Sequence, residues 1–223
     1  MTARERLTAA SRGGPTDRRA VLLWPSGSRS DAEIVPVDEV GAALSEDPDR
    51  MVLAHVLSPF GRALADGFPL NELLTADPVA GQRKLEGYLG ETRQDLHTAM
   101  EFGADGVFYQ LEGAHPAAAT PMQYGGFYLE LDRALLGEVG EARLNVMYVA
   151  GGPEPYLDFV ADLPAHLFAW DVETSGIAAD AVRPMRKGAL AASDPAAEVL
   201  FADDWVRIQA WAENGSNLET THV

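Results

Sequence analysis

The sequence contains no cysteine, so this chain can form no disulfide and no thiolate metal site, and it has no cysteine nucleophile. Positive charge is also scarce. Only 17 Lys and Arg residues stand against 34 Asp and Glu, which gives a formal net charge of −17. Such a field repels phosphate backbones and anionic lipid surfaces. We therefore expect neither a nucleic-acid partner nor a membrane partner.

Long apolar runs are missing as well. No run approaches the roughly 20 apolar residues of a transmembrane helix. Residues 1–19 also lack the apolar stretch of about 7–15 residues that a secretory signal needs. We expect a cytoplasmic protein. With 223 residues, 47 % of them hydrophobic, the chain is long enough for a core that needs no disulfide or structural metal. No internal linker is visible, so we expect a single domain over 1–223.

Short apolar runs bounded by turn residues recur along the chain and predict buried strands. These strands are expected at 20–24, 34–37, 51–57, 106–111, 144–150, 167–171, 187–192 and 217–223. The segments between them predict helices at 2–12, 38–44, 60–102, 121–139, 155–163 and 177–185, with another that starts at Asp203 or Asp204. Residues 60–102 are expected to break into two or three helices at Gly67-Phe68-Pro69 and Asp77-Pro78. Alternation of strands and helices indicates right-handed βαβ units and a parallel sheet.

Seven or eight such units predict an α/β fold, namely a (β/α)8 TIM-like barrel that is reduced or incomplete. The count depends on 34–37, because Pro36 limits that segment to an edge strand or a bulge. An open doubly wound sheet is the rival architecture, and it usually carries a Gly-rich turn after its first strand. Here that turn is Pro25-Ser26-Gly27-Ser28, which is neither a dinucleotide fingerprint nor a P-loop. The barrel is therefore preferred.

In either architecture the functional face lies beyond the carboxyl ends of the strands. Polar residues at or just after the predicted strands are therefore candidates for a site. They are His55, Ser58, Gln110, Glu112, His115, Tyr148, Asp171, Glu173, Asp194 and His222.

Several candidates also have a plain structural interpretation. His55 and Tyr148 lie in apolar strands, where a hydrogen-bonded core residue fits equally well. Asp171 and Asp194 can each cap a helix. Glu112 and His115 stand in a loop of Gly and Ala, where packing requires neither side chain. Their position therefore favours a functional role for Glu112 and His115.

Two common kinds of catalytic site find little support. A zinc ion could use His55, Glu112, His115 or His222, yet these residues show no recognisable ligand spacing. A GxSxG elbow, as in Ser-His-Asp hydrolases of the α/β class, is absent from the sequence. We expect a site without metal and without an organic cofactor.

Short segments along the chain resemble uroporphyrinogen decarboxylase-like proteins. The N-terminal helix that leads to Asp17-Arg18 resembles the family's opening helix and its "DR-x-P-V" segment. Residues 55–60 (HVLSPF) resemble the strand end "GPF", and 102–106 (FGADG) resemble the "aGADgi" junction. Asp171 and 193–195 (SDP) resemble the strand ends "fswD" and "N-x-D-P". The resemblance implies a (β/α)8 barrel with a pocket at the mouth formed by the carboxyl ends of its strands.

The chain also departs from this family. Nothing between Trp24 and Asp38 matches the "RQAGRY" arginines of the decarboxylase branch, so uroporphyrinogen is not the expected substrate. Residues 144–151 fall where the cobalamin-linked methyltransferase branch carries "H-x-C-G". That branch binds zinc through a histidine and two cysteines, whose counterparts here are Tyr148, Ala150 and His222.

The resemblance and the residues together suggest an enzyme that acts on a small, carboxylated organic molecule, with a decarboxylation or another lyase-type step. Tyr148 and His222 would transfer protons, and Asp171 or Glu112 would orient them. This requires the four side chains to meet over one hollow. The other candidates are expected to bind substrate, namely His55, Ser58, Gln110, His115, Glu173 and Asp194.

Two alternatives remain at this stage. One is a methyltransferase-branch relative that has lost its zinc site. The other is a non-catalytic protein that binds a ligand or a partner. A barrel short of one βα unit would expose strand edges or an apolar flank, and pairing with a second copy is one way to cover them. We therefore expect a homodimer.

Overall fold

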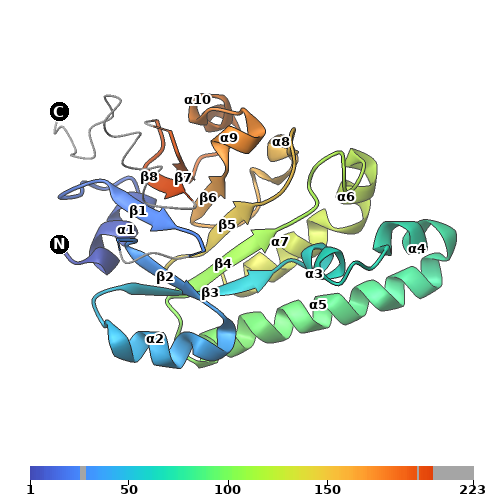
Figure 1. The fold of residues 1–223 in the computed structure, drawn as a ribbon, viewed down its shortest axis with the longest axis horizontal. Helices are drawn as coiled ribbons and strands as arrows, with labels where there is room; N and C mark the ends of the chain where they lie inside the picture. Colours follow the sequence, from blue (N-terminus) through green and yellow to red (C-terminus); the bar gives the residue numbers. More distant parts are fainter. Residues whose placement is uncertain (26–28, 195, 203–223) are drawn as a thin grey trace.

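Eight parallel strands form one sheet that curls into a nearly closed barrel, shown in Figure 1. The computed structural model describes residues 1–25, 29–194 and 196–202. The strands are β1 (Ala20–Leu23), β2 (Ala32–Val35), β3 (Met51–Leu57), β4 (Gly106–Leu111), β5 (Val146–Val149), β6 (Leu167–Trp170), β7 (Ala189–Ala192) and β8 (Val199–Ala202). Their order is β1-β8-β7-β6-β5-β4-β3-β2, and every hydrogen-bonded pair is parallel. The predicted (β/α)8 barrel is confirmed.

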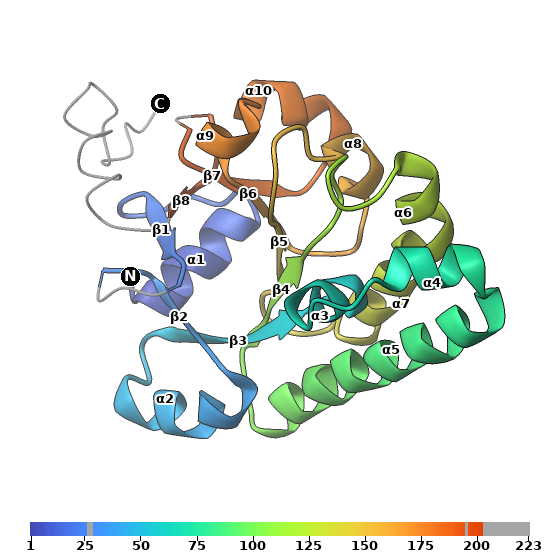
Figure 2. The same cartoon turned by 45° about the vertical axis from the view of Figure 1, so that its right-hand side comes forward.

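Helices alternate with the strands and lie mainly on the outside of the barrel, as Figure 2 shows. They are α1 (Ala3–Ser11), η1 (Val37–Glu39), α2 (Val40–Glu46), α3 (Pro59–Ala65), α4 (Leu70–Ala76), α5 (Pro78–Glu101), α6 (Pro121–Phe127), α7 (Leu129–Glu138), α8 (Leu157–Val160), α9 (Val172–Ser175), α10 (Ala179–Val182) and η2 (Arg183–Met185). In the described ranges, no helix is both long and apolar enough to cross a membrane.

The barrel has one unsealed seam, between β1 and β2, which are the two ends of the sheet. The connecting residues that the structure describes form no helix, so this crossover lacks the usual outer layer. Asp31 bridges the gap, because its backbone N–H donates to the Val21 carbonyl at 2.7 Å and its carboxylate accepts from the Val21 N–H at 2.8 Å. The Ser30 hydroxyl accepts from the Leu23 N–H at 3.0 Å. Two residues thus fill the seam in place of strand pairing.

Side chains alternate along each strand and so build two separate cores. On β3, Val52, Ala54 and Val56 point outward and pack under the helices. Inward-pointing residues fill the lumen, where Leu7 of α1 closes one end. At the other end Phe108 lies among partly buried aromatic rings. The lumen is therefore a packed core, and the candidate polar residues lie at the mouth formed by the carboxyl ends of the strands.

Most predicted elements are present, with differences that have local causes. The strands at 51–57 and 106–111 match residue for residue, and 60–102 divides into three helices at the predicted breaks. The predicted helix over 121–139 is two helices, α6 and α7, which meet at Tyr128. Strand β2 ends at Val35 because Pro36 has no N–H to continue the ladder.

The end of the chain differs more from the prediction. Strand β8 at Val199–Ala202 was not expected. The predicted helix from Asp203 or Asp204 and the predicted strand at 217–223 lie outside the described residues.

Candidate functional site

The carboxyl ends of β3, β4, β5 and β6 bring several of the candidate polar residues to one mouth of the barrel. Gln110 sits at the end of β4, in register with Leu57 of β3 on one side and with Tyr148 of β5 on the other. Val149, next to Tyr148, is in register with Trp170, and Asp171 directly follows Trp170. The backbone register therefore makes these residues neighbours.

Three side chains from two strands form a hydrogen-bonded relay. The imidazole Nε2 of His55 lies 2.8 Å from Oε1 of Gln110, and Nε2 of Gln110 donates to Oε1 of Glu112 at 2.5 Å. The Gln110 amide thus turns its NH₂ toward Glu112 and its carbonyl toward His55. His55 therefore carries its proton on Nε2, and Nδ1 is left as a basic nitrogen.

Aromatic packing controls the protonation of His55. The Trp24 ring lies 4.4 Å from the His55 ring, centroid to centroid, and Phe108 lies beyond at 6.2 Å. Burial lowers the pKa of His55, and the hydrogen bond to Gln110 opposes this only in part. The imidazole is consequently neutral near pH 7, the form in which it can accept a proton.

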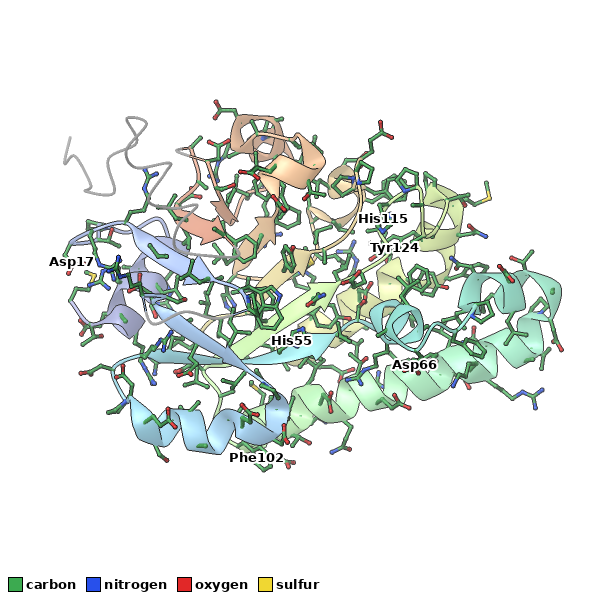
Figure 3. The ribbon with its side chains drawn as sticks, viewed as in Figure 1. Asp17, His55, Asp66, Phe102, His115 and Tyr124 are labelled. Atoms are coloured by element: carbon green, nitrogen blue, oxygen red, sulfur yellow. The ribbon has the colours of Figure 1, made fainter. Side chains whose placement is uncertain are left out.

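Glu112 and His115 converge on the glycine turn after β5 (Figure 3 labels His115). Gly151 has φ +88° and Gly152 has φ +42°, which favour glycine. A Cβ on Gly152 would stand 2.6 Å from Nδ1 of His115, and a Cβ on Gly151 would stand 3.5 Å from Oε2 of Glu112. The two glycines thus let both side chains approach the backbone. Burial lowers the pKa of His115, and the charge of Glu112 opposes that shift.

Tyr148 and Asp171 line one small cavity of about 150 Å³, together with the Gly151-Gly152 turn. The Tyr148 ring packs 5.5 Å from Phe108 and 5.0 Å from Phe201, centroid to centroid, so its position is set by the aromatic core of the lumen. Asp171 accepts hydrogen bonds from the Glu173 N–H at 2.9 Å and from the Thr174 hydroxyl at 2.7 Å. It therefore caps α9 while it borders the cavity.

Of the four residues predicted to meet over one hollow, Glu112, Tyr148 and Asp171 lie around this end of the barrel. Tyr148 and Asp171 share the cavity, and Glu112 reaches its glycine wall. His222 lies outside the described residues.

The remaining candidates occupy different positions. Ser58 is buried, and its hydroxyl accepts from the N–H groups of Gly61 at 3.1 Å and Glu112 at 3.3 Å, so it joins α3 to the Glu112 loop. Glu173 is exposed on α9. Asp194 accepts from the Ala179 N–H at 2.8 Å at the start of α10.

Sequence reasoning missed Arg62, which belongs to the same end of the barrel. A cavity of about 550 Å³ lies beside the mouth, and both His55 and Arg62 line it. Arg62 falls in α3, directly after β3. The available signal was a cationic residue in the helix that begins where a strand ends. In the described ranges, no three His, Asp or Glu residues are grouped as metal ligands.

The fold and its mouth define a (β/α)8 barrel with a polar, partly buried site at the carboxyl ends of the strands. No family model and no curated protein sequence matches this chain. A methyltransferase from Methanosarcina mazei has a similar structure, with a TM-score of 0.71 and 13 % identity over 86 % of this chain and 82 % of that one. "QR15, an Aldolase" has a TM-score of 0.46 and 14 % identity over 78 % of this chain and 77 % of that one. The first likeness shows the fold alone.

Proposed function

We propose that this protein is an enzyme that acts on a small, carboxylated organic molecule at the mouth of the barrel. Acid–base chemistry carries the reaction, and decarboxylation or another lyase-type step is the favoured class. The observation that supports this most is the relay from Glu112 through Gln110 to His55. This relay orients a neutral imidazole beside a cavity.

Each residue has a distinct task in this proposal. Glu112 fixes the Gln110 amide, and Gln110 fixes the His55 tautomer, so Nδ1 of His55 is the base. Tyr148 is the acid on the other side of the mouth, and Asp171 helps to shape its cavity. In a decarboxylation the bond from the substrate carbon to the carboxylate breaks, CO₂ leaves, and the electron pair stays on carbon. The Tyr148 hydroxyl then supplies the proton to that carbon.

The test compares the wild-type protein with Tyr148→Phe. We expect turnover of a responsive substrate, found by CO₂ release across a panel of small carboxylic acids, to fall at least tenfold while the melting temperature stays nearly constant. Tyr156→Phe is the matched control, because its hydroxyl donates to the Ala119 carbonyl at 2.9 Å and has no place in the proposed mechanism.

His222 remains a predicted proton-transfer residue, and His222→Ala belongs in the same assay. Full turnover in both Tyr148→Phe and His222→Ala would remove acid–base catalysis by these residues.

A second candidate is methyl transfer, which the structural likeness to a methyltransferase favours. In this alternative the protein would move a methyl group between small molecules at the same mouth. Mass spectrometry of products after incubation with methyl donors and thiols separates the two, because methyl transfer adds a CH₂ unit and decarboxylation removes CO₂. If neither product forms, a non-catalytic binding protein is the remaining proposal.

A further inference from the structure

The cavity beside the mouth exists because β3 is longer than its neighbour. Strand β2 ends at Val35, opposite Ala54, whereas β3 continues to Leu57 without a partner on that side. The chain turns away at Pro36 into η1, and the far end of α5 forms the opposite wall. Figure 3 labels His55 in the middle of the molecule and Phe102 at that end of α5. The resulting cavity of about 550 Å³ is larger than the one at Tyr148.

Arg62 is held in the wall of this cavity by two fixed partners. Its Nε donates to the Thr92 hydroxyl at 2.9 Å, and its Nη2 donates to the Asp95 carboxylate. Thr92 is fully buried and donates in turn to the Leu57 carbonyl at 3.0 Å, which ties the arrangement to the end of β3. Nη1 of Arg62 has no hydrogen-bond partner among the residues that the structure describes. A preoriented guanidinium with one nitrogen uncommitted is well suited to bind a carboxylate.

The charges around the cavity select the class of ligand. Among the residues that the structure describes, Arg62 is the one cation that lines it, while Asp38 and Asp95 are anions and His55 is neutral near pH 7. A ligand with only a carboxylate would add to a local negative charge, and a ligand with only an ammonium group would leave Arg62 unused. A zwitterion satisfies both kinds of group. Apolar side chains also line the cavity, namely Pro36, Val37, Leu57 and Phe102.

We infer that this cavity binds a small zwitterion of the α-amino-acid class, with the ligand carboxylate on Arg62 and its ammonium group near Asp38. The apolar wall then receives the ligand side chain. The inference rests on the proposed function for the role of His55, which lines this cavity, and it adds a permanent positive charge on that side of the mouth. None of His55, Gln110, Glu112, Tyr148 and Asp171 carries a permanent positive charge, whereas Arg62 does and lines the same cavity as His55.

The first experiment is isothermal titration calorimetry with three probes that share one side chain. They are leucine, 3-methylbutylamine, which lacks the carboxylate, and 4-methylpentanoate, which lacks the ammonium group. Leucine is expected to bind at least tenfold more tightly than either of the others. Equal binding of the amine would show a cation site, equal binding of the acid would show an anion site, and no binding of any probe would overturn the inference.

Variants then place the binding in this cavity. Arg62→Gln should weaken leucine at least tenfold and leave the amine unchanged. Arg83→Gln, on the exposed side of α5, makes the same change in net charge and should leave both unchanged. Asp38→Asn, at an exposed position, should weaken leucine and the amine but not the acid, and it remains informative if Arg62→Gln does not fold. Leucine affinity that is unaffected by both cavity variants would place the ligand elsewhere.

The same titration separates this inference from the proposed reaction. Tyr148→Phe should keep its affinity for leucine, because Tyr148 does not line this cavity. Intact binding without any turnover would leave the zwitterion site standing and refute the enzyme. Turnover of simple carboxylic acids without leucine binding would support the enzyme and refute the zwitterion site.

Discussion

At the scale of single residues, Asp132 is a buried carboxylate held by two tyrosine hydroxyls. It is fully buried in α7, outside the barrel, and it accepts hydrogen bonds from the hydroxyls of Tyr109 at 2.6 Å and Tyr124 at 2.9 Å. Burial raises its pKa to about 6, although both hydrogen bonds favour the ionised form. Figure 3 labels Tyr124 in this region, away from His55. We assign this cluster to stability rather than to the site.

The raised pKa predicts how stability changes with pH. The carboxyl has a pKa of about 6 when folded and an ordinary pKa of 3.8 when unfolded, so between these pH values the folded state binds more protons than the unfolded state. Its contribution to the free energy of unfolding is therefore full below about pH 4 and is lost as the pH rises through about 6, on the order of 3 kcal/mol in total. Urea unfolding between pH 4 and pH 8 should show this slope in the wild type and not in Asp132→Asn. Parallel curves for the two proteins would refute it.

At the scale of elements, α5 shows how two glycines in one helix can have opposite roles. Gly81 packs against α4, where an added Cβ would stand 2.6 Å from the Leu74 Cα. Gly87 is exposed, and an added Cβ would meet nothing within 4 Å. Gly81 thus allows the close approach of two helices, while Gly87 only weakens the helix.

These contacts predict opposite signs for the same substitution. Gly87→Ala should stabilise the protein by about 0.5–1 kcal/mol, because alanine reduces the conformational entropy of the unfolded chain. Gly81→Ala should destabilise it by about 1–3 kcal/mol through overpacking against Leu74. Chemical denaturation of both variants measures the two values. Effects of equal sign would mean that α4 and α5 do not pack as described.

At the scale of the whole molecule, the β1–β2 seam depends on buried charge. The Asp31 carboxylate is fully buried and accepts from Arg6 Nη1 at 2.6 Å and from Arg18 Nη2 at 2.8 Å, in addition to the Val21 N–H. Arg6 also pairs with Asp17, whose side chain is 45 % exposed. Arg6 thus bridges two carboxylates: the buried Asp31, which closes the barrel, and the partly exposed Asp17.

The seam supplies a matched pair of variants. Asp31→Asn should cost about 3–5 kcal/mol of unfolding free energy, because it leaves buried donors without their charged acceptor. Asp17→Asn removes the same charge from the same arginine at the surface, and a much smaller loss is expected because water screens that pair. Thermal unfolding compares the two. Similar losses would show that Asp31 does not close the barrel.

The oligomeric state remains a prediction at this scale. Asp31 and Ser30 occupy the open edge of β1, so part of the edge that was expected to drive dimerisation is already bonded within the chain. We still predict a homodimer, and light scattering in solution decides it. A mass near 23.9 kDa would show a monomer.

Local sequence patterns determined much of this fold. Apolar runs of the length of a strand placed β3 and β4, and Pro69 and Pro78 marked the breaks that separate α3, α4 and α5. Helix α1 begins with a capping box in which Thr2 and Glu5 bond each other's backbone N–H, within the predicted 2–12 helix. These signals act over a few residues, because strand burial, proline sterics and helix caps depend on near neighbours in the chain.

The tertiary structure alone decided which polar groups meet. The sequence placed His55, Gln110 and Glu112 in or just after predicted strands. Their hydrogen-bonded relay, however, depends on the register of β3 against β4, and no local sequence pattern predicts that register. Likewise Arg62 and His55 line one cavity only because β3 extends beyond the end of β2. The C-terminal end of α5 forms the opposite wall of that cavity. Such contacts join residues far apart in the chain, and their geometry follows from how the barrel closes rather than from the identity of any one segment.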